Sequence, residues 1–160
     1  MTRLLEFAAL TVVQAVLAAP ALADEQPARQ NFFNDPFLQI TDGLTACPTP
    51  PGPEITEAEM RAEAHGRSER GGSCYRDGRC RLPNAYLYDR EIIPRVKIAI
   101  AADGRFAKTT SVWALGQRRW VTLRGCVSTA AEAVELERLV KVLDDVEAVV
   151  NQLEVRGGGR

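Results

Sequence analysis

The sequence has little of what catalytic and metal sites are usually built from. It contains one histidine, His65, and its only closely spaced cysteines, Cys74 and Cys80, are separated by five residues. Zinc ligands usually cluster, with about two to four residues between paired cysteines, so no metal site is predicted. There is no Gly-x-Ser-x-Gly sequence and no glycine-rich phosphate loop between a strand and a helix. We therefore expect a protein that is not an enzyme and has no cofactor.

The composition also lacks an excess of charge of either sign. The 20 lysine and arginine residues are balanced by 21 aspartate and glutamate residues, which gives a formal net charge of −1. Domains that bind nucleic acid are usually strongly basic, because contacts to phosphates supply much of their affinity. We therefore expect no nucleic-acid partner.

Long apolar runs are absent except at the amino terminus. There, the basic start Met1–Arg3 precedes the apolar run Leu4–Leu17, and Pro20–Ala23 ends in an Ala-x-Ala site. This arrangement is typical of a secretory signal peptide, and we expect cleavage after Ala23. The alternative is an uncleaved anchor, but the run is shorter than the roughly 20 apolar residues of a spanning helix. The mature protein is predicted to be exported and to have no transmembrane span.

The four cysteines are expected to form disulfides in an exported protein. Four cysteines allow three pairings, and the sequence alone does not choose among them. Cys74 and Cys80 flank a short glycine-containing segment that favours a local bridge, which leaves Cys47 to pair with Cys126. The alternative is a thiol redox protein that uses Cys74 and Cys80, with arginines stabilising a thiolate. That alternative lacks the Cys-x-x-Cys spacing of such sites.

The carboxyl-terminal third contains a regular pattern of apolar residues. They alternate along Trp120–Val127 and again from Val146 to Val155, as in half-buried strands. Between these segments, Thr129 and Glu132 form a capping box that begins a helix. The apolar residues of this helix share one face, at Leu136, Leu139, Val140 and Leu143. The pattern predicts a strand, a helix and a second strand.

A further helix and strand are predicted immediately upstream. The helix covers Tyr86–Ile100, with Asp89 as its candidate N-cap and Asp103-Gly104 as its end. The strand covers Thr109–Leu115, and Gln117–Arg119 forms the turn into the next strand.

The run Val121-x-Leu123-x-Gly125-x-Val127, the helix after it and the strand Val146–Val155 resemble a BON domain over roughly residues 88–155. The resemblance implies an α+β fold, an α-β-β-α-β domain with helices on one face of a three-stranded mixed sheet. Two positions depart from the family pattern: Asp145 replaces a usual glycine, and the turn 117–119 lacks Asn-Gly-like residues. The resemblance also implies a bacterial periplasmic module that binds phospholipid or attaches proteins at the cell envelope.

The chain is therefore predicted to have four parts. These are a signal peptide (1–23), a Pro/Arg-rich extension (24–85), a BON-like domain (86–155) and a disordered tail (156–160). Within the extension, Thr56 and Glu59 form a second capping box, which predicts a short helix near 57–64 that ends by Gly66.

The extension is expected to pack on the domain. Residues 31–40 are too apolar for a free tail, and Thr45–Pro53 contains four prolines and reads as a polyproline-like tether. Alternation along the central strand directs a second set of side chains away from the helices. This set comprises Trp120, Thr122, Arg124 and Cys126. A Cys47–Cys126 bridge would fasten the extension across that face of the sheet.

Two surfaces are candidates for binding anionic phospholipid or another envelope component. The first is the outer face of the helix 86–100, with aromatic, basic and apolar side chains suited to a lipid interface. It comprises Tyr86, Tyr88, Arg90, Arg95, Lys97 and Ile98. The second is an arginine-rich loop that comprises Arg67, Arg70, Arg76, Arg79 and Arg81.

For both surfaces a structural interpretation stays open. The tyrosines and Ile98 then pack under the extension, and the arginines are merely solvated. The corresponding alternative function is a protein–protein adaptor or a stress-protective factor that does not bind lipid.

Overall fold

A computed structural model describes residues 26–156. The predicted signal peptide and residues 157–160 of the predicted tail lie outside this range. In chain order, the elements are β1 (Arg29–Gln30), β2 (Phe37–Asp42), β3 (Ile55–Thr56), α1 (Glu57–Arg76), the 3-10 helix η1 (Ala85–Tyr88), α2 (Asp89–Asp103), β4 (Thr110–Gln117), β5 (Trp120–Val127), α3 (Ala130–Lys141) and β6 (Ala148–Val155).

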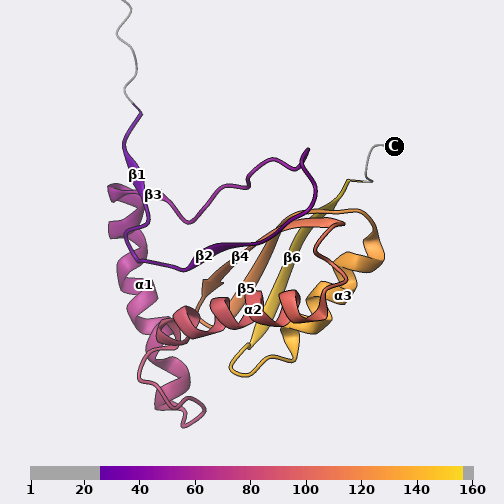
Figure 1. Ribbon diagram of the computed structural model, residues 1–160. Helices are drawn as coiled ribbons and strands as arrows, with labels where there is room; N and C mark the ends of the chain where they lie inside the picture. Colours follow the sequence, from indigo (N-terminus) through magenta and orange to yellow (C-terminus); the bar gives the residue numbers. More distant parts are fainter. Residues whose placement is uncertain (1–25, 157–160) are drawn as a thin grey trace, which may run out of the picture.

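Four strands form one mixed sheet in the order β2-β4-β5-β6. β4 is antiparallel to both β2 and β5, whereas β5 and β6 are parallel and are connected through α3. Figure 1 shows α2 and α3 together on one side of this sheet. The predicted α+β fold is confirmed. Its three expected strands are β4, β5 and β6, and the extension adds β2 as a fourth strand at the edge.

The core lies between the sheet and the two helices. Its fully buried side chains from β5 and α3 are Val121, Leu123, Val127, Leu136 and Val140. Gly125 is required in β5, because its φ is 115° and an added Cβ would lie 2.2 Å from the Ser111 carbonyl oxygen. Only glycine tolerates both this backbone conformation and this close approach of β4.

A two-residue turn joins β4 to β5, and a buried carboxylate stabilises it. Arg118 and Arg119 have φ values of 58° and 67°, as in the type I′ turns that usually prefer Asn-Gly. Asp89 Oδ2 accepts a hydrogen bond from the Arg118 amide at 2.6 Å, and its Oδ1 accepts one from the Arg119 amide at 2.7 Å. The prediction that Asp89 caps α2 is therefore wrong. Asn84 instead caps η1 by accepting from the Tyr86 amide.

Helix α1 is much longer than the short helix predicted near 57–64. The capping box of Thr56 and Glu59 is confirmed, but the helix continues through Gly66 to Arg76. Gly71 lies within this helix and does not interrupt it. Asn84 packs against the helix at this position, where an added Cβ would lie 2.5 Å from Asn84 Oδ1, so only glycine leaves enough room. Much of the predicted arginine-rich loop is consequently helical.

The extension is attached to the domain by a buried ion pair. Arg67 of α1 donates from Nη1 to Asp35 Oδ2 at 3.0 Å and also contacts Asp35 through Nη2. Gln117 at the end of β4 donates to the same Asp35 Oδ2 at 2.6 Å. The Arg67 guanidinium lies between the rings of Phe33 and Tyr86, 4.0 and 4.1 Å from their centroids. This contact joins α1, the segment before β2, η1 and the sheet.

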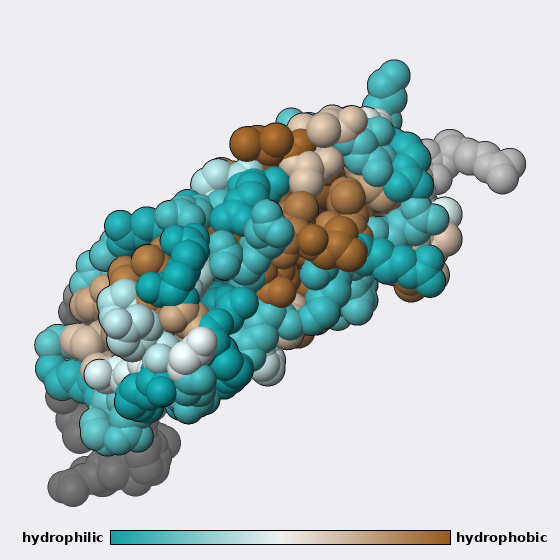
Figure 2. All heavy atoms as spheres, turned by 90° about the horizontal axis from the view of Figure 1, so that it is seen from below, coloured by the Kyte–Doolittle hydropathy of each residue, from teal (hydrophilic) through white to brown (hydrophobic). Residues whose placement is uncertain are grey.

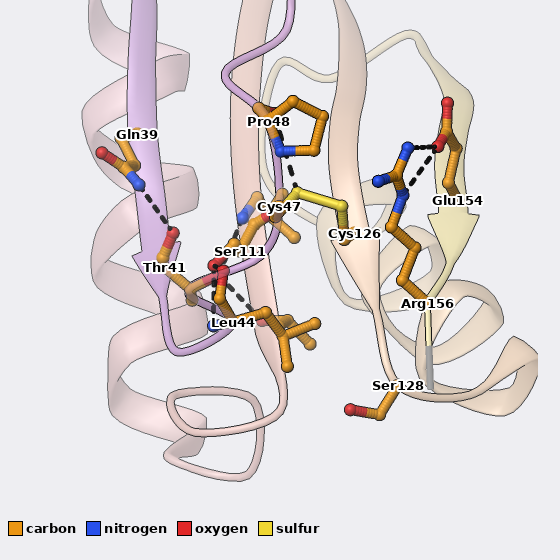
Figure 3. The surroundings of a disulfide bond; sticks show 12 residues. Gln39, Thr41, Leu44, Cys47, Pro48, Ser111, Cys126, Ser128, Glu154 and Arg156 are labelled. Carbon is orange, nitrogen blue, oxygen red and sulfur yellow. Dashed lines mark hydrogen bonds and ion pairs between the residues drawn. A yellow bond between two sulfur atoms is a disulfide. The ribbon is translucent and has the colours of Figure 1, made fainter. Parts of the chain in front are cut away.

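Both predicted disulfides, Cys47–Cys126 and Cys74–Cys80, are present. The first fastens residues 43–53, the strap, across the sheet face opposite α2 and α3. Figure 3 shows Cys47 at this crossing, next to Leu44 and Ser111. The Ser111 hydroxyl accepts from the Leu44 amide at 2.8 Å.

The strap covers only part of the outer face of β5. Arg124 is covered, and it donates to the Pro51 carbonyl oxygen at 2.7 Å. Trp120 stays 39% exposed. The prediction that the extension covers this face of the sheet is therefore confirmed at Cys126 and Arg124, but the strap does not reach Trp120.

The buried pair predicts a large stability loss when one partner is removed. Arg67→Met should lower the free energy of unfolding by about 3–5 kcal/mol, because it leaves Asp35 buried without its counter-charge. The double variant Arg67→Met/Asp35→Leu should lose less than the sum of the two single changes. Urea denaturation of the four proteins measures this coupling. A loss below about 1 kcal/mol for Arg67→Met would contradict the structural role given to the pair.

The turn predicts an unusual pH dependence of stability. Burial raises the pKa of Asp89 from 3.8 to about 7, although the two backbone hydrogen bonds from the turn act in the opposite direction. Because the folded pKa exceeds the unfolded one, the stabilising contribution is complete below about pH 4 and is lost as the pH rises to about 7. The free energy of unfolding of the wild type should therefore fall by up to about 4 kcal/mol between about pH 4 and pH 7. In Asp89→Asn this part of the pH dependence should be absent. Chemical denaturation at a series of pH values tests this, and parallel curves for the two proteins would contradict it.

Candidate binding face

The outer face of α2 carries an apolar side chain that the core does not use. Ile92, Ile93, Val96 and Ile100 point into the core, each at most 1% exposed. Ile98 lies on the opposite side of the helix and is 68% exposed. At 100° per residue, Ile98 cannot share the buried stripe of its neighbours.

A second exposed apolar residue, Val142, ends α3 next to the same face. Val142 is the C-cap residue of α3 and is 79% exposed. Arg95 of α2 donates to the Asp144 carbonyl oxygen at 2.8 Å, which places the end of α3 against the middle of α2. Ile98 is one turn after Arg95, and Val142 is two residues before Asp144. In Figure 1, α2 lies below the sheet. Figure 2 shows the molecule from below, and an apolar patch bordered by hydrophilic side chains lies on this side. We call Ile98, Val142 and the exposed surface around them the helix face.

Two cations on α2 are free to meet an anion. Arg90 and Lys97 are exposed, and within residues 26–156 neither has a carboxylate within ion-pair distance. Arg95 is different, because its guanidinium lies 3.6 Å from Asp145 and 3.9 Å from Glu91. The structure therefore keeps Arg90, Lys97 and Ile98 as candidates and assigns Arg95 to the contact between α2 and the loop after α3.

The two tyrosines of the predicted lipid-binding set do not belong to this face. Tyr88 is 1% exposed, and its hydroxyl accepts a hydrogen bond from the Leu82 amide at 2.8 Å. Tyr86 is half-buried beneath Arg67. The prediction that both are accessible aromatics is wrong, because the tyrosines lie on the side where α1 and the segment 82–85 pack.

The arginines of the second predicted patch are divided among different roles. Arg67 is buried against Asp35, and Arg81 pairs with Glu91 and Asp145 at 3.1 and 3.2 Å. Arg79 pairs with Asp77 at 2.9 Å on the surface. The prediction of one continuous five-arginine patch is therefore wrong. The exposed members toward the end of α1 are Arg70, Arg76 and Arg79.

Sequence reasoning did not identify Val142 as part of the site. Leu143, its neighbour, completes the apolar stripe of α3, so Val142 necessarily falls outside that stripe. An apolar residue off the stripe at a helix end was the available signal. Its position relative to α2 depends on how α2 and α3 pack, which the helical pattern does not specify.

The groove beneath the strap offers little free binding capacity. It has a volume of about 380 Å³ and is lined by prolines of the strap and by Arg124, Gln152 and Glu154. Arg124 already donates to Gln152 and to the Pro51 carbonyl oxygen, and Glu154 already accepts from Arg156. Most polar groups of this groove therefore hold the strap and the sheet together.

Within residues 26–156, no group of three His, Cys, Asp or Glu side chains is arranged to hold a metal ion. No helix in the same range has the length and apolar character needed to cross a bilayer.

Comparison with known families identifies a match to the BON domain model at residues 88–157. This range begins at the end of η1 and contains α2, β4, β5, α3 and β6. No curated protein and no solved structure matches the chain. The helix face therefore lies within the matched segment, whereas α1, β2 and the strap lie outside it.

Proposed function

We propose that this chain, in which residues 88–157 form a BON domain, is a non-catalytic module of the bacterial envelope that binds anionic phospholipid through its helix face. BON domains are generally associated with the envelope and are generally not enzymes. The observation that carries the proposal is the occurrence of exposed Ile98 and Val142 together with Arg90 and Lys97, two cations without an ion-pair partner among residues 26–156. A membrane interface satisfies both groups, because acyl chains accept the apolar side chains and phosphates accept the cations.

The expected affinity is modest. An aliphatic side chain contributes about 1.5–3 kcal/mol when it is fully removed from water. Each cation near an anionic surface adds about 1 kcal/mol. Two partly inserted aliphatics and two cations therefore support reversible binding at the membrane surface rather than permanent anchoring.

The sequence and the disulfides support a periplasmic location for this activity. The predicted signal peptide would export the chain, and both disulfides would persist in an oxidising compartment. The buried sulfurs also weigh against the thiol redox alternative. Cys74 and Cys80 are 4% and 9% exposed, and reactive cysteines require access to solvent.

A second candidate function is an adaptor that binds an envelope protein through the same face. Exposed aliphatics beside cations would also suit an amphipathic partner with acidic residues. The two functions differ in their dependence on lipid charge.

Vesicle co-sedimentation tests the lipid-binding proposal. Wild-type protein should bind vesicles of equal parts phosphatidylglycerol and phosphatidylcholine but not pure phosphatidylcholine. Arg90→Glu/Lys97→Glu should reduce binding to the anionic vesicles at least tenfold, because it replaces attraction with repulsion. Ile98→Ser/Val142→Ser should reduce it by a similar factor through loss of apolar insertion.

Matched controls separate these effects from general changes of surface. Val155→Ser removes an equally aliphatic side chain that is 54% exposed at the end of β6, and Lys108→Glu reverses an exposed charge outside the helix face. Both should bind like wild type. Equal binding to neutral and anionic vesicles, or no vesicle binding by wild type, would exclude the proposed lipid function.

A further inference from the structure

The segment that ends α1 forms a rigid, exposed tip. Cys74 and Cys80 close a short loop, and Gly78 adopts φ 69° within it. The Gly78 amide donates to the Tyr75 carbonyl oxygen at 3.0 Å, and the Arg79 amide donates to the Cys74 carbonyl oxygen at 2.8 Å. Disulfide and backbone hydrogen bonds together fix this loop before any partner binds. We call residues 70–80 the stapled tip.

The stapled tip displays residues that suit an anionic interface. Tyr75 is 51% exposed, and within residues 26–156 neither Arg70 nor Arg76 has a carboxylate within ion-pair distance. Arg79 is exposed and pairs with Asp77. Tyrosine is favoured at membrane–water interfaces, where its ring and its hydroxyl meet different surroundings.

The base of the stapled tip is held against the BON domain. Arg119 in the β4–β5 turn donates to Cys80 Sγ at 3.1 Å. Arg81 pairs with Glu91 of α2 and with Asp145 after α3. These contacts fix the direction of the tip relative to α2 and α3. In Figure 1, the tip projects below the sheet, on the side where α2 and α3 lie.

We propose that the stapled tip is a second contact of this protein with the same anionic bilayer, in which Arg70, Arg76 and Arg79 meet lipid phosphates and Tyr75 lies at the interface. This inference rests on the proposed function, because the tip and the helix face would engage one membrane. The tip precedes the segment that matches the BON domain, so it is a feature of this chain's extension. Two rigidly connected contacts bind more tightly than either alone, because the second binds at high effective concentration.

The test compares tip variants with a charge-matched control in full-length, oxidised protein. Arg76→Gln/Arg79→Gln should weaken binding to vesicles of equal parts phosphatidylglycerol and phosphatidylcholine about 25-fold, since each basic residue near the surface contributes about fivefold and the two factors multiply. Arg61→Gln/Arg156→Gln removes two exposed arginines away from the tip, and it should bind like wild type. Direct contact is read from Tyr75→Trp, whose added fluorescence should be quenched by brominated phosphatidylglycerol.

The outcomes distinguish the inference from the proposed function. If wild type does not bind the anionic vesicles, the proposed function fails and the inference fails with it. If Arg90→Glu/Lys97→Glu abolishes binding but the tip variant binds like wild type, the helix face stands and the second contact is overturned. An unquenched Tyr75→Trp would overturn it as well, and would favour a tip that faces a protein partner instead.

Discussion

The arrangement of this molecule depends on the buried ion pair between Arg67 and Asp35. A buried charge is tolerated only when it is paired and hydrogen-bonded, and here one carboxylate serves α1 and the end of β4 together. Two aromatic rings enclose the guanidinium on its faces. The pair therefore makes the extension a structural part of the domain. Without it, α1 would be attached mainly through its contacts with η1 and β3.

This attachment has consequences for the surface. The extension supplies β2 to one edge of the sheet and the strap to one face, so those regions are occupied by the chain itself. The opposite layer, made of α2 and α3, stays open and carries exposed Ile98 and Val142. Because Arg81 and Arg119 hold the base of the tip against this layer, the tip and the helix face have a fixed geometry. Such a fixed geometry is what the proposed association with a membrane surface requires.

Much of the domain could be predicted from local sequence, because periodicity and capping are local. The β5 alternation, both capping boxes and the Asp103-Gly104 helix end follow from neighbouring residues. The roles of Asp89 and Tyr88 could not be predicted, since each depends on a partner distant in sequence, the 118–119 turn and the Leu82 amide. The length of α1 could not be predicted, because Gly66 by itself indicates a helix end, whereas the helix continues to Arg76 and Gly71 makes a tertiary contact with Asn84. Arg67 was grouped with surface arginines for the same reason: its burial depends on Asp35, 32 residues away.

Native-state hydrogen exchange under non-reducing conditions tests most directly whether extension and domain form one cooperative unit. The amides of α1 between Arg67 and Cys74 are expected to exchange with the same opening free energy as those of β4 and β5, because the buried pair opens only with the core. If these α1 amides exchange several kcal/mol more easily than the sheet, the extension is a loosely attached tether. The fixed geometry of the tip and the helix face would then be contradicted.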